Sequence, residues 1–290
     1  MRCLVFGSNG YIGKHLVEML LNKGYEVITP LDQKGQIIDL TNEELVNSVD
    51  WNVDSVFMFA GVTGTAASFD NHKKFLIGND LILLNVLNSI RLSTNRPRVI
   101  FPSSRLVYRG SEIPLIETAE LEARTIYSNN KISCEQYLHT YSLLFDIPFT
   151  ILRICVPYAN NLSKEYSFGT VGNFTKQAKN NALIILYGNG SIRRTFTHIE
   201  DLCRFTILAN EHMKAINEVF NIPGDNLSLY EVAFLIATRV GATVKCIEWP
   251  EFDSRMESGS TVFDSTKLLT TLKTELTHSF YDWVNVLDSR

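Results

Sequence analysis

The chain has 290 residues, of which 45% are hydrophobic, and its formal net charge is −4. This length supports one large or two modest cores, and the acidic balance with scattered lysines and arginines argues against a protein that binds the nucleic-acid phosphate backbone. The five cysteines form no C-x-x-C unit, and the sequence has neither an 18-residue apolar run nor a signal-peptide core. It therefore predicts a reduced, cytoplasmic protein without membrane spans, zinc fingers or disulfides.

The first half of the chain alternates short apolar runs with longer amphipathic ones. Strands are predicted at residues 2–6, 26–31, 55–59, 98–102 and 149–154. Helices are predicted between them at residues 11–23, 69–91 and 127–145. This alternation is typical of an α/β fold, a Rossmann-like doubly wound parallel sheet with helices on both faces.

The pattern changes beyond residue 157. Residues 158–172 are rich in Asn, Ser, Gly and Tyr and are predicted as a loop that enters a second lobe. Later runs predict strands at 218–222 and 244–248 and helices at 229–240 and 280–287. The expected division is a first domain at 1–155, with a returning segment at about 195–222, and a smaller C-terminal lobe at 156–290.

A glycine-rich segment follows the first predicted strand directly. Gly7, Gly10 and Gly13 form a G-x-x-G-x-x-G pattern that opens the first predicted helix. Glycines at these positions permit a tight turn and bring the backbone close to a pyrophosphate on the helix N-terminus. The segment therefore predicts that the first domain binds a dinucleotide. Its expected contacts in this loop are Gly7, Asn9, Gly10, Tyr11, Ile12 and Gly13.

Two aspartates are candidates for the adenosine end of the dinucleotide. Asp32 follows the second strand and either accepts the ribose hydroxyls, which favours NAD, or serves as a turn residue. Lys14 and Lys34 suit the 2′-phosphate of NADP instead, so the expected cofactor is NAD(H) or NADP(H). Asp39 and Leu40 are expected near the adenine, and the alternative is that Asp39 caps the helix that follows.

Tyr127 and Lys131 stand four residues apart on a predicted helix and so share one face. Proton exchange near neutral pH requires the phenol pKa to fall from about 10, which corresponds to about 4 kcal/mol of preference for the phenolate. A neighbouring ammonium in a partly shielded site is a source of that preference. The spacing alone is common on helices that use Tyr and Lys for packing, so its meaning depends on the other motifs.

Several further motifs follow in a fixed order. They are Phe59-Ala60-Gly61 after the third strand, Asn79 in the next helix, Ser103-Ser104 after the fourth strand, Leu152-Arg153, Gly188 to Phe196, His198-Ile-Glu-Asp201, and Asn221-Ile-Pro-Gly224. Together with the glycine loop and the Tyr127/Lys131 pair, they resemble the extended short-chain dehydrogenase/reductase family over nearly the whole chain. The branch that the chain resembles contains the nucleotide-sugar epimerases, dehydratases and reductases.

The resemblance implies a role for each matching residue near the cofactor. Ser104 is expected to hydrogen-bond the substrate oxygen, and Tyr127 to pass the proton. Lys131 is expected to hold the nicotinamide ribose and to keep the tyrosine acidic. Ala60, Gly61 and Asn79 are the expected cofactor neighbours after the third strand.

For the substrate, the resemblance implies a nucleotide-diphosphate sugar. Arg194 and Arg255 are expected to grip its diphosphate, which suits a guanidinium fork. The alternative for each arginine is an ordinary ion pair. Arg105 and Tyr108, near the catalytic serine, are candidates for sugar contacts, and the alternative for Tyr108 is simple packing.

Three departures from the family pattern narrow the reaction. Arg105-Leu106 stand where 4,6-dehydratases carry an Asp-Glu pair, so dehydration is not expected. Asp32 and Asp39 are separated by a short crossover like that of the 4-keto-6-deoxy-sugar reductases. Val156 replaces an asparagine that contacts the substrate in many relatives, which leaves the sugar undefined.

The leading expectation is therefore an NAD(P)H-dependent reductase of the C4 keto group of a nucleotide-bound 4-keto-6-deoxyhexose. An NAD-dependent C4 epimerase is the alternative, and a non-catalytic redox sensor is a third interpretation. A homodimer through the two long helices is expected. His72, His139 and His198 show no metal-ligand spacing, so no metal site is predicted.

Overall fold

The computed structural model describes residues 1–162 and 169–287. By the density of its internal contacts the chain divides into two compact units, each assembled from separated segments. The first unit comprises Met1–Val107, Ala123–Arg153 and Thr206–Phe220, and the second comprises Tyr108–Glu122, Ile154–Phe205 and Asn221–Arg290. The second unit thus includes residues 108–122, which lie inside the range expected for the first domain, and the returning segment at 206–220 is shorter than expected.

The first unit is built on a central parallel sheet, which confirms the predicted Rossmann-like class. Its strands are ordered β2-β1-β3-β4-β5-β9. They are β1 (Arg2–Phe6), β2 (Glu26–Ile28), β3 (Ser55–Met58), β4 (Arg98–Ser104), β5 (Phe149–Ile154) and β9 (Glu218–Asn221). Leu4 of β1 lies opposite Ile28 of β2 and Val56 of β3. β3 and β5 are buried along their full lengths, because strands covered on both faces read as continuous apolar runs.

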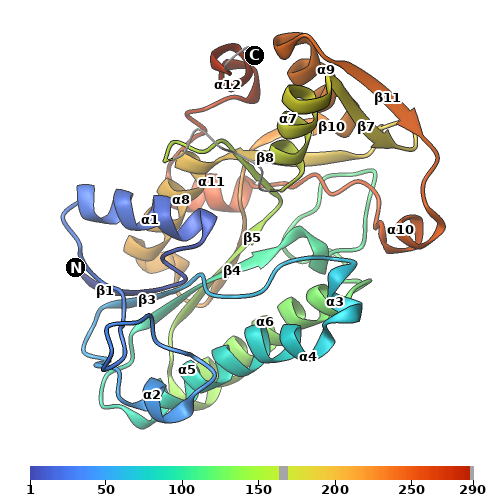
Figure 1. Ribbon diagram of the computed structural model, residues 1–290. Helices are drawn as coiled ribbons and strands as arrows, with labels where there is room; N and C mark the ends of the chain where they lie inside the picture. The colour runs from blue at the N-terminus through green and yellow to red at the C-terminus, as the bar shows by residue number, and fades with distance from the viewer. Residues whose placement is uncertain (163–168, 288–290) are drawn as a thin grey trace. The chain divides into compact units, whose positions relative to one another are not determined.

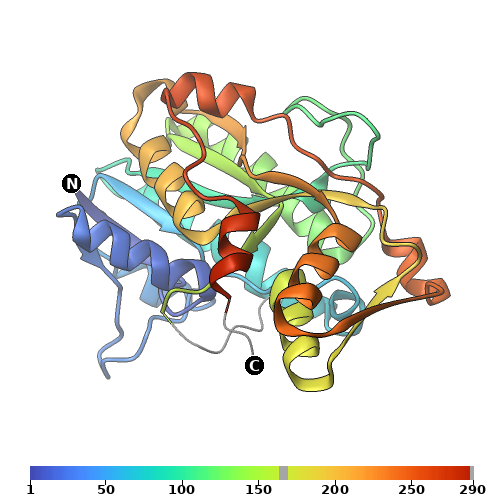
Figure 2. The same cartoon turned by 90° about the horizontal axis from the view of Figure 1, so that it is seen from above.

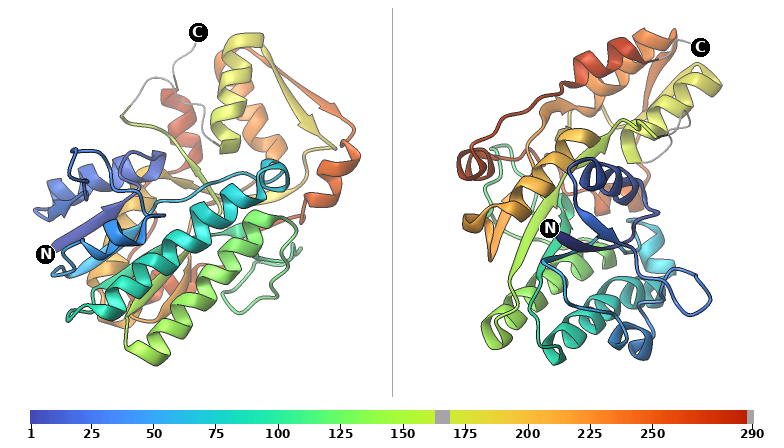
Figure 3. Two further views of the ribbon diagram at one scale, coloured as in Figure 1. Left: turned by 60° about the horizontal axis from the view of Figure 1, so that its bottom comes forward. Right: turned by 90° about the vertical axis from the view of Figure 1, so that its left-hand side faces the viewer.

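Helices cover both faces of this sheet (Figure 1). They are α1 (Tyr11–Asn22), α2 (Glu43–Asn47), α3 (Ala67–Asp70), α4 (His72–Phe75), the π-helix η1 (Leu76–Leu81), α5 (Ile82–Leu92), the 3₁₀-helix η2 (Arg105–Val107), α6 (Ile126–Phe145) and the 3₁₀-helix η3 (Met213–Ala215). A core cluster joins apolar side chains of β1, β3, β4 and β5 to α5 and α6. These two helices run side by side (Figure 3).

Two predicted elements of this unit differ from the structure. β2 ends at Ile28 rather than at residue 31, because Leu31 forms an isolated antiparallel bridge with Ile37. The helix expected at 69–91 is broken at Asn71, where the backbone leaves the helical region at φ −119°, and again by η1. A π-turn inserts an extra residue and redirects side chains, which periodicity in the sequence does not reveal.

The second unit contains a three-stranded sheet ordered β10-β8-β6 and a two-stranded parallel sheet of β11 and β7 among the described residues. Its strands are β6 (Val156–Tyr158), β7 (Leu183–Tyr187), β8 (Arg193–His198), β10 (Asp225–Ser228) and β11 (Thr243–Ile247). Its helices are α7 (Gly169–Asn181), α9 (Leu229–Val240), α10 (Glu251–Met256), α11 (Thr266–Leu272) and α12 (Phe280–Val286), while α8 (Ile199–Glu211) begins here and ends in the first unit. α7 lies beside α9 (Figure 2).

Capping signals in the sequence explain why helix α9 has the predicted bounds. α9 spans the predicted residues because Ser228 and Glu231 form a capping box at its start and Gly241 takes a left-handed conformation at its end. Of the loop predicted at 158–172, residues 163–168 lie outside the described part of the chain. Residues from Gly169 onward belong to α7 instead.

Among the described residues, the stretch His72–Leu92 is long and apolar enough to pass a length-and-composition test for a membrane span. More than half of its test window is buried inside the structure, which is the pattern of a core helix.

Candidate active site

The glycine loop between β1 and α1 is built so tightly that side chains do not fit. Gly7 has φ +81°, and a Cβ added to it would lie 2.4 Å from the carbonyl carbon of Phe59 at the end of β3. A Cβ on Gly13 would lie 2.1 Å from the carbonyl oxygen of Gly7. The Gly10 amide donates to that same oxygen at 2.9 Å. The loop therefore brings its backbone close to the sheet edge, as a pyrophosphate-binding turn requires.

The N-terminus of α1 is open to an anion. Its N-cap is Gly10, which offers no side-chain hydrogen bond, and its first turn carries no acidic residue. The first backbone amides and the positive end of the helix dipole are therefore available to phosphate oxygens. Tyr11 and Ile12 are half-buried and Asn9 is exposed at this end. These features fit a dinucleotide.

Exchanging Gly7 for alanine is expected to abolish NAD binding. Besides the left-handed strain of about 1–2 kcal/mol, the new methyl group would collide with the Phe59 backbone and displace the loop. Gly24→Ala is a matched control, because Gly24 has φ +83° and open space around its missing Cβ. Isothermal titration with NAD should show binding to the Gly24 variant and none to the Gly7 variant; equal affinities would contradict the placement of the pyrophosphate.

The two aspartates expected near the adenosine each close a local turn. Asp32 Oδ1 accepts from the backbone amides of Lys34 at 2.8 Å and Gln36 at 2.9 Å. Asp39 Oδ1 accepts from the amide and hydroxyl of Thr41 at 2.9 and 2.8 Å. The turn interpretation of Asp32 thus accounts for one of its oxygens.

The residues around Asp39 also have structural partners. Asn42, rather than Asp39, caps α2, because its side chain accepts from the Leu45 amide at 3.2 Å. Leu40 is buried, and its carbonyl oxygen accepts from the Asn85 side chain at 2.9 Å. A nucleotide contact by Asp32, Asp39 or Leu40 remains a prediction.

Asn79 holds the backbone that follows β3. Its side-chain oxygen accepts from the Val62 amide at 3.0 Å, and its side-chain nitrogen donates to the Val62 carbonyl at 3.1 Å. A Cβ on Gly61 would lie 2.9 Å from the Asn79 oxygen, which explains the glycine next to the half-buried Ala60. Asn79 sits in the π-helix η1, and its side chain shapes the loop expected to contact the cofactor.

Ser104, Tyr127 and Lys131 come together in the first unit, with exposures of 8%, 9% and 7%. Ser104 ends β4, and its hydroxyl lies close enough to the Tyr127 phenol to lower the pKa of that phenol. Tyr127 is the second residue of α6, whose start is fixed by a capping box between Thr125 and Ser128. The Lys131 ammonium lies 5.8 Å from the centroid of the Tyr127 ring.

Burial is the largest influence on the pKa values of Tyr127 and Lys131. Burial raises the pKa of Tyr127 to about 12, and the Ser104 hydroxyl and the charge of Arg105 lower it less than burial raises it. Lys131 donates to the Pro102 carbonyl at 2.7 Å, and burial lowers the pKa of its ammonium. Desolvation of the phenolate therefore outweighs the charge of Arg105, and the role of Lys131 in keeping the tyrosine acidic stays a prediction.

The raised pKa of Tyr127 predicts a loss of stability in alkali. The neutral phenol of Tyr127 contributes to the free energy of unfolding in full below the unfolded-state pKa of about 10. This contribution is lost as the pH rises through the folded-state pKa of about 12, and the total loss is up to about 3 kcal/mol. Urea unfolding of the chain and of Tyr127→Phe across this interval should show a shallower decline for the variant. Parallel declines would show that Tyr127 does not carry the linkage.

Arg105 occupies the turn directly after Ser104. It begins η2, and only 9% of its surface is exposed. Its charge acts on the Tyr127 phenol in the direction that favours the phenolate. The position therefore places a buried cation in the catalytic neighbourhood, consistent with its candidacy for a substrate contact.

The sequence analysis did not predict the buried ion pair between Arg153 and Glu135. Arg153 of β5 donates to Glu135 of α6 through Nε at 3.0 Å and Nη2 at 2.6 Å, and both side chains are at most 5% exposed. Ser103 of β4 donates to the same carboxylate at 2.5 Å. The sequence held a signal, because Glu135 is one helical turn beyond Lys131 and shares its face.

The second unit contains the two arginines expected to bind a diphosphate, and each has an acidic partner. Arg194 of β8 is 6% exposed and pairs with Glu257 at 2.6 Å. Arg255 of α10 pairs with Glu251 at 2.5 Å, and its side chain is 76% exposed. A guanidinium has five N–H donors, so each arginine can contact a phosphate oxygen beside its glutamate, and the diphosphate contact remains a prediction.

Tyr108 and Val156 are structural in this unit. Tyr108 is fully buried, donates its hydroxyl to Asn221 at 2.7 Å and packs edge-on against Phe263, so the packing interpretation accounts for it. Val156 is buried in β6 opposite Phe196 of β8. Among the histidines for which the sequence showed no metal-ligand spacing, His139 packs against Phe149 and His72 is exposed.

Comparison with known proteins gives one consistent result. A family model described as the NAD dependent epimerase/dehydratase family matches residues 3–223. An uncharacterised UDP-glucose epimerase, YtcB of Bacillus subtilis, is 27% identical in an alignment of 261 residues that covers 81% of this chain and 81% of that one. A UDP-glucose 4-epimerase of Thermotoga maritima, solved with UDP-glucose, has a TM-score of 0.85 at 23% identity over 99% of this chain and 97% of that one.

A UDP-glucuronic acid 4-epimerase of Bacillus cereus, solved with UDP-glucuronic acid and NAD, has a TM-score of 0.84 at 24% identity over 98% of this chain and 96% of that one. At these identities the solved structures establish the fold alone. The family model covers well over half of the chain and spans the motifs from Gly7 to Pro223. The chain belongs to the NAD dependent epimerase/dehydratase family, the extended short-chain dehydrogenase/reductase group that its motifs resemble.

Proposed function

We propose that the chain is an NAD-dependent C4 epimerase of a nucleotide-diphosphate sugar. The observation that carries the proposal is the grouping of Ser104, Tyr127 and Lys131 in the unit that also holds the glycine loop. The relatives reported above are named as sugar epimerases, which supports the epimerase over the 4-ketoreductase favoured by the sequence. Arg105-Leu106 in place of an Asp-Glu pair continues to weigh against dehydration.

The proposed chemistry assigns a distinct task to each side chain. Bound NAD supplies the hydride acceptor and donor for the sugar C4. Tyr127 takes the proton of the C4 hydroxyl as that carbon loses its hydride, and returns it when hydride comes back to the opposite face of the ring. Ser104 holds the C4 oxygen by a hydrogen bond in both halves. Lys131 donates one N–H to the Pro102 carbonyl and would hold the nicotinamide ribose with its other donors.

The high phenol pKa has a consequence for this cycle. At neutral pH the ligand-free chain carries Tyr127 as a neutral acid, which is the form that protonates a C4 oxyanion. Taking a proton in the other direction requires added positive charge, which oxidised nicotinamide supplies when bound. Arg105 already acts in that direction.

The proposed substrate and cofactor contacts use residues that also form ion pairs or turns within the chain. Arg194 and Arg255 are the proposed diphosphate ligands, and each would bind phosphate through N–H donors other than the one paired with Glu257 or Glu251. NAD is proposed over NADP on the basis of Asp32 and the family as a whole, against the competing Lys14 and Lys34. We also propose a cytoplasmic location and a homodimer, the latter testable by light scattering.

The 4-ketoreductase remains the second candidate because of the short crossover between Asp32 and Asp39. That segment is closed by two Asp-centred turns and contains one isolated bridge, between Leu31 and Ile37. Incubation with NADH or NADPH and 4-keto-6-deoxy sugar nucleotides separates the candidates. The epimerase account predicts no stoichiometric loss of nicotinamide absorbance, and sustained consumption of the reduced cofactor would favour the reductase.

A further inference from the structure

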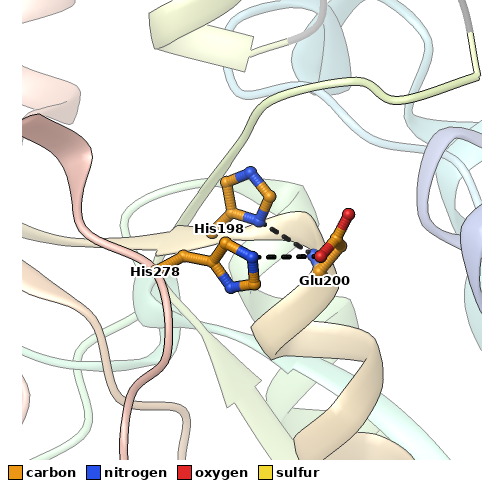
Figure 4. A group of neighbouring side chains, drawn as sticks. All are labelled: His198, Glu200 and His278. Atoms are coloured by element: carbon orange, nitrogen blue, oxygen red, sulfur yellow. Dashed lines mark hydrogen bonds and ion pairs between the residues drawn. The ribbon is translucent and has the colours of Figure 1, made fainter. Parts of the chain in front are cut away.

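Polar side chains also meet away from the residues given a catalytic role. In the second unit, His198, Glu200 and His278 gather at the start of α8 (Figure 4). The two histidine rings stack with centroids 4.2 Å apart, and Glu200 lies 3.0 Å from His278 Nε2, so this group connects the segment before α12 to α8. In the first unit, Asp80 of η1 contacts α6, the helix whose first turns carry the proposed catalytic residues.

Asp80 is a buried carboxylate held by two side chains of α6. It is 4% exposed, and its Oδ2 accepts from Asn130 Nδ2 at 2.5 Å. Its Oδ1 accepts from the Tyr137 hydroxyl at 3.4 Å. Asn130 and Tyr137 are about two helical turns apart, so both lie on the face of α6 that packs against η1. Asp80 therefore fixes the position of α6 along η1.

The contact between Asp80 and Asn130 is not favourable for stability alone. Burial raises the pKa of the Asp80 carboxyl, because the charged form loses its hydration. The Asn130 Oδ1 is buried and has no hydrogen-bond partner in the described part of the chain. A buried polar atom without a partner is destabilising, and an apolar pair at these two positions would avoid that penalty. The pair is therefore better explained by what it positions.

The neighbours of this contact connect it to the part of the unit expected to hold the cofactor. Asn79 precedes Asp80 in η1, and its side chain holds the Val62 backbone through hydrogen bonds of 3.0 and 3.1 Å. Lys131 follows Asn130 in α6. The hydrogen bond from Asn130 to Asp80 thus joins the loop after β3 to the helix of Lys131. A π-helix such as η1 is frequent at functional sites.

We propose that Asp80 is a positioning residue, whose hydrogen bond with Asn130 sets the place of Lys131 relative to the loop after β3 and thereby the affinity for NAD and kcat. Asp80 acts through Asn130 and Lys131 rather than on the reacting atoms. A displacement of about 1 Å in a positioned group costs up to about 10²-fold in rate. The effect on kcat rests on the proposed epimerase function, whereas the effect on NAD affinity does not.

The test compares two variants of the purified full chain. Asp80→Leu combined with Asn130→Leu removes the contact and leaves neither partner buried and unpaired, whereas Asp80→Asn keeps an oxygen that accepts from Asn130. The double variant should bind NAD about tenfold more weakly in isothermal titration and lower kcat for C4 inversion by about 10- to 100-fold. Its melting temperature should be no lower than that of the parent. Asp80→Asn should stay within about threefold of the parent in both NAD affinity and kcat.

Ser89→Ala is the control for the loss of a buried hydrogen bond. The Ser89 hydroxyl accepts from Trp51 Nε1 at 2.9 Å in the same unit, and neither residue has a proposed role at the site. This variant should have a lower melting temperature with unchanged NAD affinity and kcat, the opposite pattern. If the double variant does not fold, Asn130→Ala removes the donor alone and should also weaken NAD binding by about tenfold.

Two results would overturn the role of Asp80. One is parental NAD affinity and kcat in the double variant, or in Asn130→Ala where that variant replaces it. The other is a loss in Asp80→Asn as large as that in the double variant. A parent chain that binds NAD but does not invert C4 would instead contradict the proposed reaction, and the NAD affinities of the variants would still decide the role of Asp80.

Discussion

Replacing Tyr127 with phenylalanine is expected to lower kcat by about 10²- to 10⁴-fold, the usual contribution of a positioned acid–base group. The substitution removes only the phenol oxygen, whose pKa the nearby Ser104 hydroxyl lowers. The ring of Tyr127 packs edge-on against Phe75, and phenylalanine preserves that contact. Steady-state kinetics should therefore show the loss in kcat, while NAD affinity and the circular dichroism spectrum stay close to those of the parent.

Tyr141→Phe is the matched control for this result. Tyr141 lies on the same helix, is half-buried and packs against Phe145, so the same hydroxyl is removed away from Ser104. Its kcat should equal that of the parent. If the Tyr127 variant retained parental turnover, the assignment of Tyr127 as the proton carrier would be refuted.

Replacing Glu135 with glutamine should destabilise the chain by about 3–5 kcal/mol, because the buried Arg153 would lose the carboxylate that pairs with it. The loss is large because the carboxylate accepts from both Arg153 and Ser103, with almost no access to water. Urea unfolding monitored by tryptophan fluorescence measures the change in free energy.

Glu26→Gln is the comparison within the same unit. Glu26 pairs with Arg2 at 3.0 Å, but its side chain is 65% exposed, so the change should leave stability nearly unaltered. Similar losses in the two variants would contradict the importance of burial. A double variant, Glu135→Met with Arg153→Met, should recover much of the stability, because it leaves no unpaired charge in the core.

The parts of the fold that the sequence predicted well are those with local signals. β1 and β5 are continuous apolar runs, and α9 has a cap at each end. The glycine loop was also readable, because Gly7 and Gly13 stand where any side chain would collide with backbone.

The features that the sequence did not reveal depend on partners distant in the chain. The segment 108–122 joins the second unit through isolated bridges such as that of Leu115 with Phe263. The π-helix η1 turns Asn79 toward Val62, which no periodic pattern indicates. The direction of the Tyr127 pKa depends on burial, whereas the Tyr-x-x-x-Lys spacing showed only the nearby charge.

The sequence alone also did not decide between a 4-ketoreductase and a C4 epimerase. The crossover between Asp32 and Asp39 is short, and its length favoured a 4-ketoreductase. Surface loops change length readily without changing chemistry, so this feature carries less weight than the epimerase relatives. Ser104, Tyr127 and Lys131 serve both reactions, because reduction is one half of epimerisation.

The central claim is tested most directly by giving the purified chain NAD and UDP-hexoses that carry deuterium at C4, with the products analysed by NMR and mass spectrometry. The epimerase account predicts a product inverted at C4 that retains the deuterium, with no net change in nicotinamide absorbance. That product should be missing from the Tyr127→Phe reaction. Failure to invert C4, together with stoichiometric oxidation of NADH or NADPH by a 4-keto-6-deoxy sugar nucleotide, would contradict the account.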